Sequence, residues 1–231
     1  MCGRYTLAGA DPVAVRSRFA VGESVEVRRR YNIAPGDQVL AVTNDRDGAA
    51  RGELLRWGLV PSWADSPETG LRMINARVET VAERPAFRRA FERWRCLIVA
   101  DGFYEWQHQP STGKQAFQIT RRDGAPFAFA GLWSTWHGSS DAKLRTCTIL
   151  TTAANRVVAP LHHRMPIILA AQAEAGWLDP ATPAAQLRTL LSGLDADETA
   201  VRPVGPAVND ARRDGPECLA APLRALQATL F

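Results

Sequence analysis

The chain has 231 residues, of which 46% are hydrophobic and 23% are charged, as is typical of a globular protein with a sizeable core. Its formal net charge of +4 and isoelectric point of about 9.2 permit a nucleic-acid partner without requiring one. No stretch approaches the ~18 consecutive apolar residues of a membrane-spanning helix, and the start is a poor secretory leader, so we expect a cytoplasmic protein with no membrane partner.

The four cysteines are widely spaced and form no CxxC pair. Together with the four histidines they show no zinc-binding spacing, so we expect no metal and no cofactor. Reduced thiols in a cytosolic setting are the natural interpretation. The residues concerned are Cys2, Cys96, Cys147 and Cys218, with His108, His137, His162 and His163.

The first chemically distinctive position is Cys2. A small side chain in second place favours removal of Met1, which would leave an α-amine and a thiol on adjacent carbons of Cys2. The amine can attack an aldehyde to form an imine, and the thiol can then close a five-membered thiazolidine ring. Reference pKa values near ~8 for the amine and ~8.5 for the thiol make both groups reactive after modest tuning. On its own and without structural context, Cys2 is better interpreted as only a small residue after a start codon.

The predicted elements alternate between short strands and short helices along the chain. Asp11-Pro12 is a helix start with a capping carboxylate, and residues 64–72 are polar and expected to be mobile. Turns are expected at residues 44–48 and at Asp101-Gly102. After the second turn the chain is expected to return as the strand over 103–106. Strands are predicted over residues 2–7, 38–43, 52–57, 95–100, 103–106, 115–120, 126–133 and 144–152, helices after Asp11 and over 85–94, 171–178 and 183–192, and a tail through 201–208 and 218–231.

This pattern predicts a single α+β domain over residues 1–231. We expect a curled, barrel-like and mainly antiparallel sheet flanked by short helices. There is no internal repeat, low-complexity segment or clear linker.

Several polar and aromatic residues allow two interpretations each. Trp57 is expected to pack in the core, whereas Trp63 could instead be an exposed platform for a base. Glu105 lies between Tyr104 and Trp106; burial would raise its pKa and suit it to proton transfer, but a solvent-facing edge strand would give it no role. The pair His162-His163 is either acid–base machinery or a surface feature.

Taken together, several stretches resemble the SRAP (SOS response-associated peptidase) family of abasic-site processing proteins. Cys2-Gly3-Arg4 opens the set, and the others follow in family order across nearly the whole chain. They are residues 31–35, 57–63, 75–80, 95–97, 101–106, 129–133 and 162–166.

The resemblance implies the fold, partner and chemistry. It implies that Cys2, exposed by loss of Met1, crosslinks through a thiazolidine to the ring-opened aldehyde of an abasic site in single-stranded DNA. The family name implies a peptidase activity, and an imine at the same site could also cleave the strand as a lyase. We further expect a monomeric bacterial protein that is associated with the nucleoid when bound to DNA. The implied catalytic set is Cys2, Asn75, Glu105 and His162; the implied DNA-binding set is Arg4, Arg77, Arg164, Trp63 and Trp106.

Two other functional classes remain open at this level. An N-terminal cysteine nucleophile amidohydrolase, such as a glutaminase, also exposes a cysteine in second place and attacks an amide carbonyl. A basic module without catalysis would bind abasic and intact single strands alike.

Overall fold

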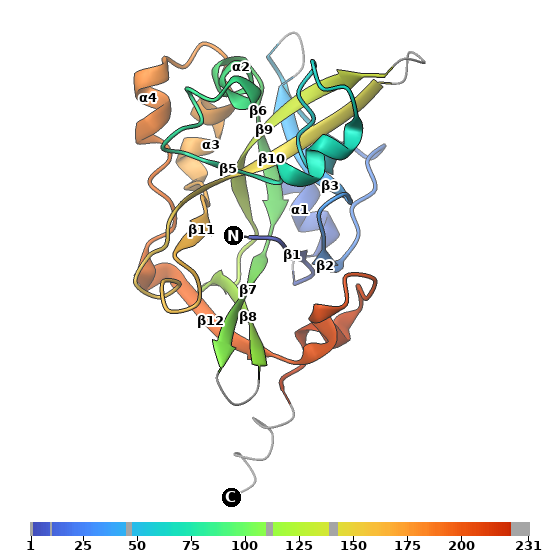
Figure 1. Ribbon diagram of the computed structural model, residues 1–231, viewed down its shortest axis with the longest axis vertical. Helices are drawn as coiled ribbons and strands as arrows, with labels where there is room; N and C mark the ends of the chain where they lie inside the picture. The colour runs from blue at the N-terminus through green and yellow to red at the C-terminus, as the bar shows by residue number, and fades with distance from the viewer. Residues whose placement is uncertain (1, 10, 45–47, 110–112, 139–142, 223–231) are drawn as a thin grey trace, which may run out of the picture.

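A closed barrel is the centre of the fold in this computed structural model (Figure 1). The structure describes residues 2–9, 11–44, 48–109, 113–138 and 143–222, and within them five strands form the ring. Their order is β10-β4-β3-β6-β9, and β9 pairs with β10 to close it. The pair β4–β10 is parallel and the others are antiparallel. The strands are β3 (Gln38–Asn44), β4 (Ala50–Trp57), β6 (Arg95–Ala100), β9 (Phe127–His137) and β10 (Lys143–Ala153).

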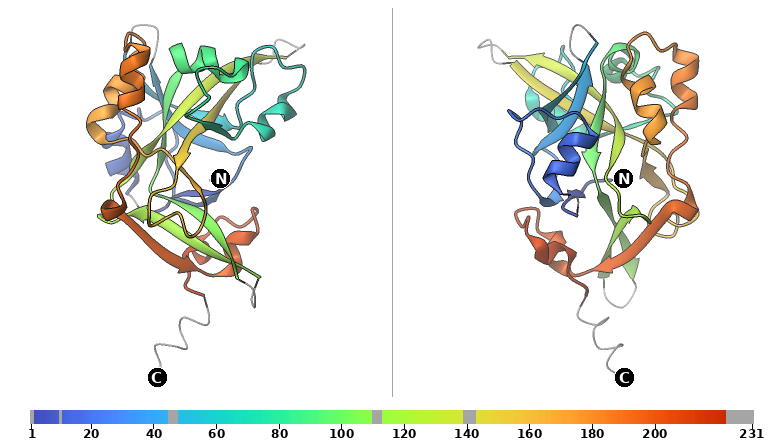
Figure 2. Two further views of the ribbon diagram at one scale, coloured as in Figure 1. Left: turned by 60° about the vertical axis from the view of Figure 1, so that its left-hand side comes forward. Right: turned by 180° about the vertical axis from the view of Figure 1, so that it is seen from behind.

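A second sheet is open and antiparallel, in the order β12-β8-β7-β1-β2. It lies below the barrel, and the start of the chain lies between the two (Figures 1 and 2). Two short strands, β5 (Asn75–Arg77) and β11 (Arg164–Pro166), pair with β10 at the end of the barrel that faces this sheet. The strands of the second sheet are β1 (Tyr5–Leu7), β2 (Arg30–Ile33), β7 (Gly102–Gln109), β8 (Gly113–Arg121) and β12 (Thr199–Val204).

Tyr5 joins the two sheets through the core. Its ring is fully buried and makes edge contacts with Trp57 and Phe129 of the barrel, with centroids 5.3 and 5.6 Å apart. Burying aromatic rings in edge-to-face contact stabilises the junction beyond the area removed from water. The first strand is thereby fixed against the barrel.

Two helices, α2 and α3, pack against the barrel strands β6 and β9. The helix α2 buries Phe87 and Phe91 and exposes its arginines, as its amphipathic pattern predicts. Because α3 covers β6 from outside, every residue of β6 is buried, which explains its continuous apolar run. The helices are α1 (Pro12–Arg18), α2 (Pro85–Arg93), α3 (Ala171–Leu178) and α4 (Ala184–Thr189), with 3-10 turns η1 (Pro67–Arg72), η2 (Ala196–Glu198), η3 (Pro206–Asn209) and η4 (Pro216–Leu219).

The predicted α+β class and barrel-like sheet are confirmed. The predicted strand over 103–106 lies within β7, but the turn before it does not bring β7 back onto β6: among the described residues, β6 pairs with β3 and β9 of the barrel and β7 pairs with β1 and β8 of the second sheet. The Asp101 carboxylate accepts bonds of 2.6 Å from the Thr6 hydroxyl and from the amides of Ala8 and Gly9, which ties this crossing point to β1. A Cβ at Gly102 would lie 2.9 Å from the Thr6 hydroxyl, so the approach requires glycine.

Smaller corrections concern element ends. Asp11 precedes α1 but makes no side-chain cap bond, the first strand begins at Tyr5, and α4 ends at Thr189. The segment 64–72, expected to be mobile, contains η1, where Gly70 packs on Gly58 so closely that a Cβ on Gly70 would lie 2.4 Å from the Gly58 carbonyl oxygen. Residues 45–47 of the predicted turn and 223–231 of the predicted tail lie outside the described residues.

Candidate active site

The start of the chain runs antiparallel to β7, at the junction of the barrel and the second sheet. Tyr5 pairs with Phe103, and the Tyr104 amide donates to the Arg4 carbonyl at 2.9 Å. Cys2 is fully buried there. Met1, whose removal the resemblance implies, lies outside the described residues.

Asn75 holds the backbone of Cys2 from the barrel side. Its strand β5 is parallel to β10, with Asn75 opposite Ile149, and its Nδ2 donates to the Cys2 carbonyl oxygen at 2.7 Å. The Asn75 Oδ1 is buried and has no hydrogen-bond partner within the part of the chain that the structure describes. A buried acceptor without a partner is costly, so this oxygen is suited to receive a proton donor from a ligand.

Glu105 lies on β7, which is an inner strand between β8 and β1. Its side chain is buried, with only 4% of the residue exposed, and this excludes the solvent-facing interpretation. Burial raises the pKa of Glu105 to about 7. A carboxyl group with this pKa can both donate and accept a proton near neutral pH.

The thiol of Cys2 is protonated in this environment. Burial raises its pKa well above the ordinary range, and the nearby negative charge of Glu105 raises it further. A neutral thiol is a weak nucleophile. Chemistry that uses this thiol therefore needs a group to take its proton, and Glu105 is close enough to interact with it electrostatically.

His162 lies just before β11. The strands β11 and β5 pair with opposite edges of β10 at the same level, so that Thr151 of β10 is opposite Pro166 of β11 and Arg77 of β5. The His162 Nδ1 lies 2.9 Å from the Arg164 amide nitrogen and 3.1 Å from the Arg164 carbonyl oxygen, so the backbone of Arg164 holds the ring in place. Burial lowers the pKa of His162, which favours the neutral ring. The ring stacks on the exposed His163 with centroids 4.4 Å apart.

The sequence-predicted arginines differ in their surroundings. Arg164 is buried and forms a bidentate ion pair with Glu79 at 2.7 and 2.9 Å, and it donates to the Thr151 carbonyl at 2.6 Å. Arg4 is half-buried and donates to the Asn32 side chain. Arg77 is exposed and has no ion pair among the described residues.

The two tryptophans of the predicted DNA path also differ. Trp63 is 62% exposed, whereas Trp106 is half-buried and its Nε1 donates to the Asn209 Oδ1 at 2.7 Å. Trp57 is fully buried and donates to the Ile74 carbonyl at 2.9 Å, which confirms its predicted core position.

Sequence reasoning missed Asn32. Its amide is buried inside the second sheet and connects Arg4 with backbone carbonyls more than 170 positions away in the chain. An asparagine between Tyr31 and Ile33 in a strand was the available signal, since a buried polar group must be hydrogen-bonded.

The described residues contain no cluster of three or more metal-ligating His, Cys, Asp or Glu side chains. No helix among them is long and apolar enough to cross a bilayer.

The family model described as SOS response associated peptidase (SRAP) matches residues 1–211. The chain is 41% identical over 227 residues to the abasic site processing protein YoaM of Bacillus subtilis, covering 96% of this chain and 98% of that protein. It is 32% identical over 201 residues to the abasic site processing protein YedK of Escherichia coli, covering 82% of this chain and 83% of that protein. A solved structure from Bacteroides thetaiotaomicron has the same fold, with a TM-score of 0.84 at 23% identity, covering 96% of this chain and 100% of that one. The chain belongs to the SRAP family.

Proposed function

We propose that this protein processes abasic sites in single-stranded DNA by forming a covalent thiazolidine between Cys2 and the ring-opened sugar aldehyde. Removal of Met1 frees the α-amine that the reaction needs. The observation that carries the proposal is the contact of Asn75 with the Cys2 carbonyl at 2.7 Å, beside the buried Glu105. The names of relatives at 32–41% identity support the substrate class.

The amine of Cys2 reacts first, because it can be neutral near neutral pH whereas the buried thiol holds its proton. Its lone pair attacks C1′ of the aldehyde and gives a carbinolamine. Glu105 takes the proton released by nitrogen and returns it to the departing hydroxyl, which leaves as water and produces the imine.

The thiol reacts second. Sγ of Cys2 adds to the imine carbon, its proton passes to the nitrogen through Glu105, and the five-membered ring closes. The balance is one aldehyde, one amine and one thiol giving one thiazolidine and one water. Because the thiol is already on the adjacent carbon, the step is intramolecular, and proximity lowers its barrier.

The two other groups assist the sugar. His162 has its Nδ1 side held by the Arg164 backbone, and its imidazole is suited to protonate the ring oxygen as the sugar opens. Asn75 holds the Cys2 backbone by its Nδ2, and its Oδ1 can accept from the amine or from a sugar hydroxyl. The imine also activates the sugar for β-elimination, so strand cleavage is a side reaction that ring closure suppresses.

The direct test uses single-stranded DNA bearing one abasic site, with a denaturing gel as readout and intact mass to verify loss of Met1. We expect a heat-stable shifted band from the wild type and none from Cys2→Ala. Cys2→Ser keeps the amine but loses the thiol, so borohydride should trap its imine as a stable adduct. An equal band from Cys2→Ala, or no band from wild type lacking Met1, contradicts the proposal.

The amidohydrolase alternative is tested in parallel. Turnover of glutamine by the same preparation, lost in Cys2→Ala, together with no crosslink to abasic DNA, would replace the proposal by an acyl-transfer function. Equal non-covalent binding of abasic and intact strands, unchanged by Cys2→Ala and without any crosslink, would indicate a binding module.

A further inference from the structure

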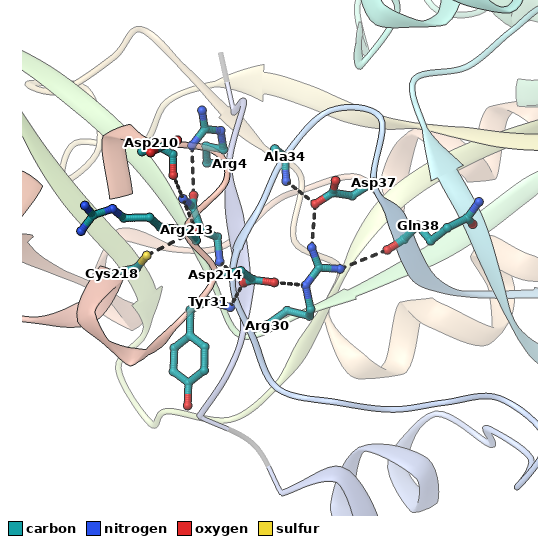
Figure 3. A network of polar contacts seen from close by, with 11 residues as sticks. Arg4, Arg30, Tyr31, Ala34, Asp37, Gln38, Asp210, Arg213, Asp214 and Cys218 are labelled. Carbon is teal, nitrogen blue, oxygen red and sulfur yellow. Dashed lines mark hydrogen bonds and ion pairs between the residues drawn. The ribbon is translucent and has the colours of Figure 1, made fainter. Parts of the chain in front are cut away.

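The C-terminal strap, residues 205–219, folds back against β2 and against Arg4, the residue before β1. It brings a cation beside the proposed DNA site (Figure 3). We propose that Arg213 of this strap is a further phosphate-binding residue for the DNA strand. The inference rests on the proposed function, and Arg213 lies beyond the residues 1–211 that the family model matches.

Asn32 anchors the strap on one side of Arg213. Its buried Nδ2 donates to the carbonyl oxygens of Val208, Asp210 and Arg213 at 3.2, 3.0 and 2.8 Å. The Arg213 amide donates back to the Asp210 carbonyl at 3.1 Å. The backbone of Arg213 is therefore fixed by groups that do not involve its guanidinium.

Asp214 anchors the strap on the other side. Its Oδ1 accepts from the amides of Tyr31 and Asn32 at 2.5 and 2.8 Å, and its Oδ2 pairs with Arg30. Arg30 in turn pairs with Asp37 at 2.6 Å. This network spans β2 and the strap, as Figure 3 shows, and it holds Arg213 between two buried or half-buried anchors.

The strap touches two residues of the proposed DNA-binding set. The Arg4 Nη1 donates to the Val208 carbonyl at 3.0 Å, and Trp106 donates to Asn209 at 2.7 Å. Arg213 is therefore attached to the same short segment that positions Arg4 and Trp106. A strand that contacts those two side chains passes beside the strap.

Arg213 forms no ion pair within the described part of the chain, although the Asp210 carboxylate is near enough to interact with it electrostatically. Asp210 pairs with Arg212 at 2.9 Å and Asp214 pairs with Arg30, whereas Arg213 is exposed and has no ion pair among the described residues. Figure 3 shows its side chain leading away from the network. A guanidinium suits the bidentate recognition of a phosphate, and the backbone that carries this one is already held in place.

The test measures the affinity of the full chain for an intact single-stranded oligonucleotide by fluorescence anisotropy over a range of salt concentrations. We expect Arg213→Ala to weaken binding about fivefold at low salt and to reduce the slope of log K against log salt by about 0.7, the value of one phosphate contact on a single strand. Arg213→Lys keeps the charge and should keep most of the slope. Arg188→Ala removes one exposed arginine from α4 and is the matched control, expected to behave as wild type.

Two results overturn the inference: an Arg213→Ala curve that coincides with wild type, or an equal loss in Arg188→Ala. At subsaturating abasic DNA, crosslinking by Arg213→Ala should slow in proportion to its loss of affinity, because the side chain acts on binding. If the wild type binds intact DNA through Arg213 but never crosslinks abasic DNA, the proposed function fails while the phosphate contact stands.

Discussion

The side-chain amide of Asn75 donates a hydrogen bond of 2.7 Å to the carbonyl oxygen of Cys2. Asn75 belongs to a strand paired with barrel strand β10, whereas Cys2 leads into β1 of the second sheet. The bond therefore connects the two halves of the fold at the residue proposed to react. Its geometry depends on how the barrel and the second sheet sit together.

Replacing Asn75 by alanine should slow crosslinking about 100-fold, because a misplaced reacting group loses the proximity advantage. Affinity for intact DNA should change little, since an amide carries no charge for phosphates. Single-turnover gel assays with abasic DNA measure the rate. Asn44→Ala is the control. Asn44 is the last residue of β3, and its Nδ2 likewise donates to a backbone carbonyl, that of Leu178. A wild-type rate in Asn75→Ala would remove this residue from the mechanism.

Glu105 should give the crosslinking rate a titration near pH 7, because burial raises the pKa of its carboxyl to about 7. Below that pH the group is protonated and cannot accept the proton of the amine, so the rate should rise as pH increases through 7. Glu105→Gln should be slower and should lack this inflection, with DNA affinity nearly intact. Rates measured from pH 5.5 to 8.5 decide the point, and identical profiles would exclude Glu105 as the shuttle.

The same group makes stability depend on pH. A pKa raised from 4.5 to about 7 in the fold means that the folded state binds more protons between these values. The stabilisation that Glu105 contributes to the free energy of unfolding is fully present below about pH 4.5 and is lost as pH rises through about 7. Relative to Glu105→Gln, the wild type should lose on the order of 3 kcal/mol between pH 4.5 and 8. Urea unfolding of both proteins at the two pH values measures this difference, and a constant gap would contradict it.

The strands and the main helices follow from local patterns, so their approximate bounds could be predicted. Barrel closure could not, because it depends on the parallel pairing of β4 with β10, whose partners are about ninety positions apart. The crossing at Asp101 was missed for a similar reason, since the residues that bind its carboxylate lie at the end of β1. Sequence patterns describe neighbours along the chain and carry little information about such long-range pairs.

The candidate site shows the same division. Glu105 could be singled out from its unusual place between two aromatic residues, but its burial was only one of two interpretations, and the structure decides between them. The environment of Arg164 could not be predicted, because Glu79 belongs to a distant stretch and only the fold brings the two together. Asn32 was missed because its partners on the strap lie at the other end of the chain.

Arg164→Ala should destabilise the protein by about 2–3 kcal/mol, because it removes a buried partner from a bidentate pair and leaves the Thr151 carbonyl without one of its donors. The half-exposed Glu79 remains solvated, which limits the loss. Urea denaturation measures the change. Glu79→Gln is the companion variant and should lose less, since the Arg164 guanidinium keeps its bond to Thr151. A neutral effect of Arg164→Ala would show that the pair contributes nothing to the fold.

Arg77→Ala should weaken binding to every single-stranded sequence by a similar factor, about fivefold at low salt, because a phosphate contact does not distinguish bases. Arg77 is exposed on β5, two residues from Asn75, and it has no ion pair within the described ranges. Removing it should reduce the salt slope by about 0.7 without changing the free energy of unfolding. Arg164 provides the contrast, since its guanidinium is occupied by Glu79. Anisotropy titrations with oligonucleotides of different composition test the prediction, and a loss confined to one base context would mean that Arg77 reads a base instead of the backbone.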